Sequence, residues 1–159
     1  MMSSSISPIP SGVSNLIPYL TCADAPAAIE FYQRAFGAVE LMRIAAADGK
    51  IMHASLQIGD SMMMLSEEVP EWGSMGPNAL GGSPVGIHVY VEDVEVAWEQ
   101  AVEAGCEVVM PLEDAFWGER FGALRDPFGH KWSLSMRIRD MTAEEIQAAA
   151  AELQPGCGD

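Results

Sequence analysis

The strongest constraint on the fold of this chain is a pattern of elements that occurs twice. In each half, a strand-like run is followed by an amphipathic helical segment and then by three more strand-like runs. The helix-ending glycines Gly37 and Gly105 lie 68 residues apart, and two leucines of the last runs, Leu65 and Leu134, lie 69 residues apart. The pattern repeats although the residues differ, so it predicts two similar βαβββ modules.

The first module is predicted over residues 13–66. Apolar residues recur at helical spacing between Asp24, whose carboxylate can cap the first turn, and Gly37, which ends the helix. Strand-like runs surround this helix at residues 13–21, 39–45, 51–58 and 61–65.

The second module is predicted over residues 85–138. Its helix follows Asp93 and ends at Gly105, in the same manner as the first helix. A turn at residues 126–129 joins the last two strands. The strand-like runs of this module are residues 86–91, 107–111, 120–125 and 131–136.

Three segments lie outside the modules. Residues 1–12 are rich in Ser and Pro, which is typical of a disordered tail. Residues 67–84 hold four glycines and three prolines and are interpreted as a linker or a lid. Residues 139–159 comprise a C-terminal helix and tail, because a capping box beginning at Thr142 opens a helix that extends to about Leu153.

The charge of the chain excludes two classes of partner. Eight Lys and Arg residues against 23 Asp and Glu residues give a formal net charge of −15, which repels nucleic acids and anionic membranes. No apolar run approaches the roughly 20 residues that span a bilayer, and the N-terminal residues lack the features of a secretory signal. The three cysteines, Cys22, Cys106 and Cys157, are far apart and fit reduced thiols. We therefore expect a soluble, cytoplasmic protein.

A series of short motifs occurs in a characteristic order between residues 14 and 140. They are Pro18-Tyr19-Leu20, Ala28-Ile29-Glu30-Phe31-Tyr32, Ala35-Phe36-Gly37-Ala38, Ile51-Met52-His53-Ala54, Ile58-Gly59-Asp60-Ser61, Tyr90-Val91-Glu92-Asp93-Val94, Phe116-Trp117-Gly118-Glu119-Arg120 and Asp126-Pro127-Phe128-Gly129-His130-Lys131-Trp132-Ser133. In this combination the chain resembles the vicinal-oxygen-chelate superfamily, which includes glyoxalase I, bleomycin-resistance proteins and extradiol dioxygenases. Within it, the chain is most similar to the PhnB-like group.

The resemblance implies an α+β fold and an assembly. The paired βαβββ modules would form a cup-shaped, eight-stranded mixed sheet, to which this chain adds its C-terminal helix. The resemblance also implies a homodimer.

Metal-dependent members of this superfamily bind a divalent ion through His, Glu or Gln on the first and last strands of each module. The positions that the resemblance assigns to these ligands carry no such residue, so we expect neither a metal nor another cofactor. A metal site would instead need His53, His88 and Glu67 to converge. The four positions that the resemblance assigns to metal ligands are Ile17, Met64, Gly86 and Ser133.

Two histidines are candidate acid/base residues. His53 alternates along its strand with Ala54 and Leu56, which we expect to face the helix-covered core together with Met52. By the same alternation, His88 shares one face of its strand with Tyr90. Each histidine is either a cavity-lining residue or an incidental polar residue of a strand. His130, which follows the turn, is interpreted as structural.

The segment 116–121 is the densest aromatic and cationic stretch of the chain. Trp117 and Phe121 offer flat apolar surface, and Arg120 offers a planar fork for a carboxylate or phosphate of a ligand. The alternatives are a salt bridge of Arg120 to one of the many acids and packing of Trp117 at a dimer interface. Tyr19 and Tyr90 are further candidates for substrate binding. Trp72, in segment 67–84, is a candidate lid aromatic.

Three functions are compatible with these residues. The leading hypothesis is a protein that binds a small, partly aromatic or anionic organic molecule in a metal-free cavity, with or without acid/base chemistry of the isomerase or lyase type. The second is a metal-dependent lyase or dioxygenase of the same superfamily. The third is a non-catalytic protein that sequesters a toxic compound. The residues leave open whether the protein is an enzyme.

Overall fold

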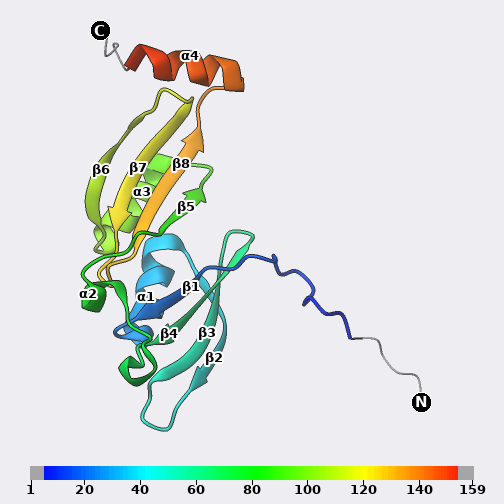
Figure 1. Cartoon of the computed structure of the whole chain (residues 1–159), viewed down its shortest axis with the longest axis vertical. Helices are drawn as coiled ribbons and strands as arrows, with labels where there is room; N and C mark the ends of the chain where they lie inside the picture. Colours follow the sequence, from blue (N-terminus) through cyan, green and yellow to red (C-terminus); the bar gives the residue numbers. More distant parts are fainter. Residues whose placement is uncertain (1–5, 154–159) are drawn as a thin grey trace. The chain divides into compact units, whose positions relative to one another are not determined.

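A computed structural model describes residues 6–153 of the chain. Within it, the chain divides into two compact units between Gly81 and Gly82, which is inside the segment 67–84 (Figure 1). Each unit contains one of the modules and is described by itself. Residues 1–5, the first part of the predicted tail, lie outside the described residues.

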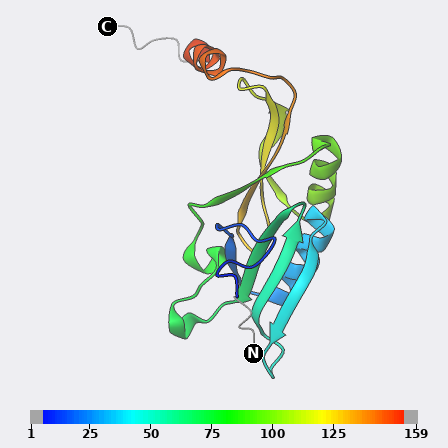
Figure 2. The same cartoon turned by 90° about the vertical axis from the view of Figure 1, so that its right-hand side faces the viewer.

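The first unit is a four-stranded sheet covered on one face by a helix (Figure 2). The strand order is β1-β4-β3-β2, with β1 parallel to β4 and the other pairs antiparallel. The sheet is therefore mixed, as predicted. Its elements are β1 (Tyr19–Cys22), α1 (Ala25–Phe36), β2 (Val39–Ala45), β3 (Ile51–Ile58) and β4 (Ser61–Glu67).

The second unit repeats this topology and adds a helix. The strand order is β5-β8-β7-β6, again with one parallel pair, β5 and β8. The predicted α+β fold of two βαβββ modules with a C-terminal helix is confirmed, whereas the single eight-stranded cup depends on how the modules pair and stays a prediction. The elements are β5 (Gly86–Tyr90), α3 (Val94–Ala104), β6 (Glu107–Asp114), β7 (Glu119–Arg125), β8 (Lys131–Arg137) and α4 (Ala143–Leu153).

The helices begin and end where the sequence predicts. The Asp24 carboxylate accepts a hydrogen bond from the Ala27 backbone N–H at 3.0 Å, and Asp93 caps α3 in the same way. Thr142 and Glu145 form the reciprocal hydrogen bonds of a capping box. No helix among residues 6–153 is long and apolar enough to cross a membrane.

Each core lies between a helix and one face of its sheet. In the first unit, Leu20, Ala54 and Leu65 form a buried row across β1, β3 and β4 that faces α1. In the second unit, Leu124 on β7 and Trp132 and Leu134 on β8 are buried and face α3. The apolar side chains of these strands thus share one face, which leaves the other face of each sheet uncovered by its helix.

Two strand boundaries differ from the prediction by more than two residues. Strand β1 begins only at Tyr19, because Pro18 has no N–H to donate to a neighbouring strand. Strand β6 continues past Pro111 to Asp114, although a proline usually ends a strand. It lies at the edge of its sheet, where a missing N–H is tolerated, and its register shifts between Met110 and Glu113.

The predicted alternation along β3 is correct only in part. Ala54 and Leu56 are buried as expected, but Met52 is 62% exposed and Ile51 is buried. The cause is a register irregularity, because His53 pairs with Ile44 while Ile51 pairs with Ala45, so that Met52 has no partner on β2.

The first part of segment 67–84 folds back on the first unit. The Glu68 carboxylate accepts a hydrogen bond from the Gly76 backbone N–H at 2.7 Å, and Val69 and Ser74 form an isolated bridge. Trp72, at the end of this loop, is 84% exposed. The segment contains η1 (Pro70–Trp72) and α2 (Pro77–Leu80). Its role as a linker or a lid stays a prediction.

Candidate functional site

The face of the second sheet that α3 does not cover carries two rows of aligned side chains. Tyr90, Ser135 and Phe121 are cross-strand partners on β5, β8 and β7. His88 and Ser133 form the next row. Because cross-strand partners point to the same face of a sheet, these side chains lie together.

Four rings gather on this face. The His88 ring packs edge-on against Tyr90, with centroids 4.9 Å apart, and is stacked on Phe121 at 5.9 Å. Trp117, in the loop before β7, meets Phe121 edge-on at 5.6 Å. The structure thus brings together four of the residues that the sequence predicts. We call His88, Tyr90, Trp117 and Phe121 the ring cluster.

A carboxylate that the prediction missed joins the ring cluster. Glu119 accepts hydrogen bonds from the Tyr90 hydroxyl at 2.6 Å, the Trp117 indole N–H at 2.9 Å and the Ser135 hydroxyl at 2.8 Å. The signal was in the sequence, because Glu119 lies two residues from both Trp117 and Phe121. The period-two alternation of a strand places residues with this spacing on one face.

The hydrogen bonds decide the charge of this carboxyl group. Partial burial works toward a higher pKa for Glu119, but the hydrogen bonds from Tyr90, Ser135 and Trp117, with a contribution from His88, bring its pKa below the ordinary value. The contact with Glu119 raises the pKa of Tyr90, because the carboxylate holds the phenol proton. At neutral pH this face therefore carries a carboxylate and a neutral phenol.

His88 is oriented by its neighbour on β8. Its Nδ1 lies 2.7 Å from the Ser133 hydroxyl, and the two groups share a hydrogen bond. Ser133 occupies one of the positions at which metal-binding relatives were expected to carry a ligand. In this chain its hydroxyl is engaged with the imidazole.

Arg120 lies on the opposite face of the sheet from the ring cluster. Its guanidinium donates hydrogen bonds to Glu95, on α3, at 2.7 Å and to Asp114 at 2.9 Å. Arg120 follows Glu119 directly in β7, so the alternation of the strand directs it toward the helix. The structure does not bring Arg120 to the other predicted residues, and its contacts are those of the salt-bridge alternative.

The uncovered face of the first sheet carries a chain of three polar groups. The Tyr19 hydroxyl and His53 Nδ1 share a hydrogen bond at 2.8 Å, and His53 Nε2 lies 3.1 Å from the Ser55 hydroxyl. The rings of Tyr19 and His53 are tilted against each other, with centroids 5.5 Å apart.

The two modules place a pair of rings at corresponding positions. Ala54 pairs with Leu65 in the first sheet, and Gly122 pairs with Leu134 in the second. Counting from these partners, His53 corresponds to Phe121, and the residue corresponding to Tyr19 is His88. The stacked pair of His88 and Phe121 in the second module therefore corresponds to the hydrogen-bonded pair of Tyr19 and His53 in the first.

Glu67 and His53, two of the three residues that a metal site would need, lie on opposite faces of the first sheet. Glu67 accepts hydrogen bonds from the backbone N–H groups of Ala25 and Ile51, at 3.2 Å each, at the start of α1. His53 contacts side chains on the other face of the same sheet, so these two residues do not converge. Within residues 6–153, no three His, Cys, Asp or Glu side chains are grouped as a metal site would require.

Two thiols are buried. Cys22 is fully buried, and burial raises the pKa of the Cys106 thiol to about 12. A thiol with this pKa is protonated at neutral pH. Cys157 lies outside the described residues.

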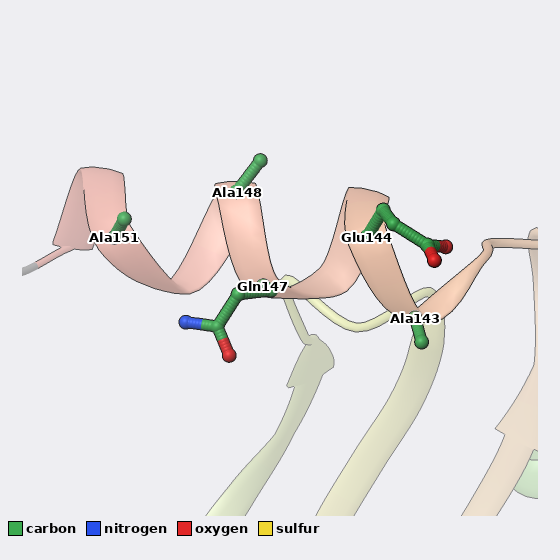
Figure 3. A pocket seen from close by; sticks show the side chains of 5 residues that line it. All are labelled: Ala143, Glu144, Gln147, Ala148 and Ala151. Atoms are coloured by element: carbon green, nitrogen blue, oxygen red, sulfur yellow. The ribbon is translucent and has the colours of Figure 1, made fainter.

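A surface hollow of about 530 Å³ lies against α4 (Figure 3). It contains none of the predicted site residues. It is lined by one helix, through the side chains of Ala143, Glu144, Gln147, Ala148 and Ala151. A stripe of small residues on one helix does not form a binding site by itself.

Comparisons with known proteins complete the description. The model of the Glyoxalase/Bleomycin resistance protein/Dioxygenase superfamily matches residues 15–134. An uncharacterized protein of Mycobacterium tuberculosis is 46% identical over 144 residues, which cover 89% of this chain and 85% of that protein. The crystal structure of TioX from Micromonospora sp. ML1 aligns with a TM-score of 0.62 and 30% identity, over 81% of this chain and 100% of that one.

A fold likeness extends to the PhnB-like group. The structure of a PhnB protein from Bacillus cereus, described as a putative 3-demethylubiquinone-9 3-methyltransferase, aligns with a TM-score of 0.61. The alignment covers 77% of this chain and 99% of that one at 18% identity, so it concerns the fold alone.

Proposed function

Because the chain belongs to the Glyoxalase/Bleomycin resistance protein/Dioxygenase superfamily, we propose that it binds a small organic molecule at the ring cluster without a metal ion. Membership of the superfamily agrees with what the sequence motifs indicated. One fold supports many activities, however, so the proposal rests on the residues of the site.

One observation carries the proposal: four rings and an ionised carboxylate lie together on a sheet face that the module's own helix does not cover. Tyr90 is 62% exposed, which is unusual for a ring that serves only packing. Flat apolar surface with a few oriented polar groups is the usual composition of a small-molecule site. A planar organic molecule would stack on these rings and hydrogen-bond to the polar groups.

The first test removes one ring. Trp117→Leu is expected to weaken binding of planar probes such as quinoline about tenfold, because it removes the stacking surface and the indole N–H. Isothermal titration calorimetry measures the affinity. The matched control is Trp72→Leu, which removes an exposed tryptophan from the other unit and should leave the affinity unchanged.

Two outcomes would count against the proposal. One is a wild-type protein to which no planar probe binds. The other is equal loss of affinity in both tryptophan variants. Stoichiometric Ni, Zn, Mn or Fe in protein purified without chelators would instead support the metal-dependent lyase or dioxygenase as the alternative function.

A second candidate function is acid/base catalysis, which the hydrogen-bonded chain of Tyr19, His53 and Ser55 favours. A phenol and an imidazole 2.8 Å apart can pass a proton to or from a bound molecule. In this function the first module would supply the proton transfer of an isomerase or lyase. If no proton transfer takes place, the protein would bind and sequester its ligand without changing it.

Proton exchange separates the two functions. If the protein is an enzyme of this kind, it exchanges a carbon-bound proton of one member of a panel of small ketones and 2-oxo acids in D2O, followed by NMR. His53→Gln is expected to slow this exchange by about 10²-fold, whereas His130→Gln leaves it unchanged. Tight, stoichiometric binding without exchange would support sequestration.

We also propose that the protein works as a cytoplasmic homodimer.

A further inference from the structure

We propose that the ring cluster and Glu119 select an organic cation, so that the ligand carries a quaternary or protonated nitrogen beside a flat apolar group. This inference rests on the proposed binding function and names the chemical class of its ligand. It concerns Glu119, which the sequence prediction did not assign to the site.

The carboxylate of Glu119 has no countercharge from a Lys or Arg side chain among residues 6–153. Its cross-strand neighbour Arg137 is bound by Asp140 instead. The three donors on Glu119 are neutral groups, so they stabilise its negative charge without cancelling it, and His88 contributes least to the lowered pKa of Glu119. A cationic ligand would supply the missing countercharge.

Aromatic rings are held in place around this charge. Tyr90 and Trp117 are both tethered to the Glu119 carboxylate by their polar hydrogens, which fixes two aromatic rings beside it. Phe121 packs against Trp117 in the same cluster. The faces of aromatic rings attract cations, and the combination of several rings with a carboxylate is a chemistry that recognises alkylated amines.

The site disfavours the opposite charge. An anionic ligand would need a cation of the chain that is not already paired. Arg120, the candidate anion clamp, points to the other face and is held by Glu95 and Asp114, and Arg137, beside Glu119, is held by Asp140. An anion at the ring cluster would meet the carboxylate of Glu119 in a chain whose net charge is −15. The predicted ligand was a partly aromatic or anionic organic molecule. The site favours an aromatic ligand, and one that carries a positive rather than a negative charge.

Three probes of nearly equal shape test this inference: N-methylquinolinium, which is a permanent cation, quinoline, which is neutral at pH 8, and quinoline-2-carboxylate, which is an anion. We expect calorimetry at pH 8 to give the highest affinity for the cation, about tenfold above quinoline, and the lowest for the anion. Higher salt should narrow these differences, because it screens the charge of Glu119.

Substitutions test whether the preference for the cationic probe comes from the Glu119 carboxylate. Glu119→Gln is expected to bring the affinities for N-methylquinolinium and quinoline within about twofold of each other. Glu119→Asp, which retains the charge, should preserve most of the preference. The matched control is Glu99→Gln, which removes an exposed charge from α3, on the other side of the sheet, and should leave the preference unchanged.

The outcomes separate this inference from the proposed function. Equal binding of quinoline and N-methylquinolinium by the wild-type protein would overturn the cation preference and leave small-molecule binding intact. An equal effect of Glu99→Gln and Glu119→Gln would also overturn it, because net charge alone would then explain the result. Failure of all three probes to bind would overturn both.

Discussion

Asp126→Ala is expected to lower the free energy of unfolding by about 3 kcal/mol. Asp126 is only 3% exposed, and its carboxylate accepts hydrogen bonds from the backbone N–H groups of Phe128 and His130 and from the indole N–H of Trp132, at 2.8 to 3.0 Å. Alanine leaves all three donors without this acceptor, and the indole is buried. A buried donor that loses its partner costs about 1–3 kcal/mol.

Urea denaturation of the full chain, followed by tryptophan fluorescence, measures this loss. The matched control is Asp60→Ala, because Asp60 lies in the exposed turn between β3 and β4 and its carboxylate accepts from the neighbouring Ser61 hydroxyl. We expect the control to change stability by less than about 0.5 kcal/mol. A similar loss in both variants would mean that the buried network around Asp126 contributes little.

The Asp126 network also matters for the site. The turn that it stabilises joins β7 to β8, and the register of these strands places Phe121 opposite Ser135. In Asp126→Ala we therefore expect weaker probe binding even under conditions in which the protein remains folded. Unchanged binding would mean that the strand register is independent of the turn.

Gly122→Val is expected to cost about 3 kcal/mol of stability. A Cβ atom at Gly122 would lie 2.5 Å from Cζ3 and 2.6 Å from Cη2 of Trp98, and 3.1 Å from the Cα of Leu112. The first two distances are shorter than any real contact, so the indole on α3 would have to move. The added side chain therefore displaces the Trp98 indole from its place against the sheet.

Gly86→Val is the matched control, because it introduces the same side chain into a strand of the same sheet. A Cβ atom at Gly86 would meet nothing within 4 Å, and the backbone there does not adopt a positive φ. We expect a change within about 0.5 kcal/mol. If thermal unfolding showed equal losses for the two variants, loss of a strand glycine rather than the contact with Trp98 would be the cause.

The parts of the fold that depend on local chemistry were predictable from the sequence. The caps Asp24 and Asp93 and the helix-ending Gly37 act within a few residues of their own position, and each has the predicted role. The two strand errors have different causes, one local and one long-range. Pro18 shortened β1, and an edge position allowed β6 to pass through Pro111, which no local pattern indicates.

The candidate site was predictable as far as period-two alternation reaches. Alternation placed His88 and Tyr90 on one face of β5, and the structure brings them to Trp117 and Phe121. The hydrogen bonds of Glu119 depend on the pairing of β8 with both β7 and β5, which is a long-range property. The position of Arg120 was within reach of the same alternation, because it is adjacent to Phe121 in one strand and must face the other way.

The correspondence between the two modules has a consequence for protein engineering. Because the module occurs twice, each site position has a counterpart with another side chain on the same strand arrangement. Phe121→His with His53→Phe exchanges one pair of corresponding residues, and His88→Tyr with Tyr19→His exchanges the other, so that the four substitutions together would transfer the polar pair from one half to the other. The repeat thus supplies a guide to redesigning what each half recognises.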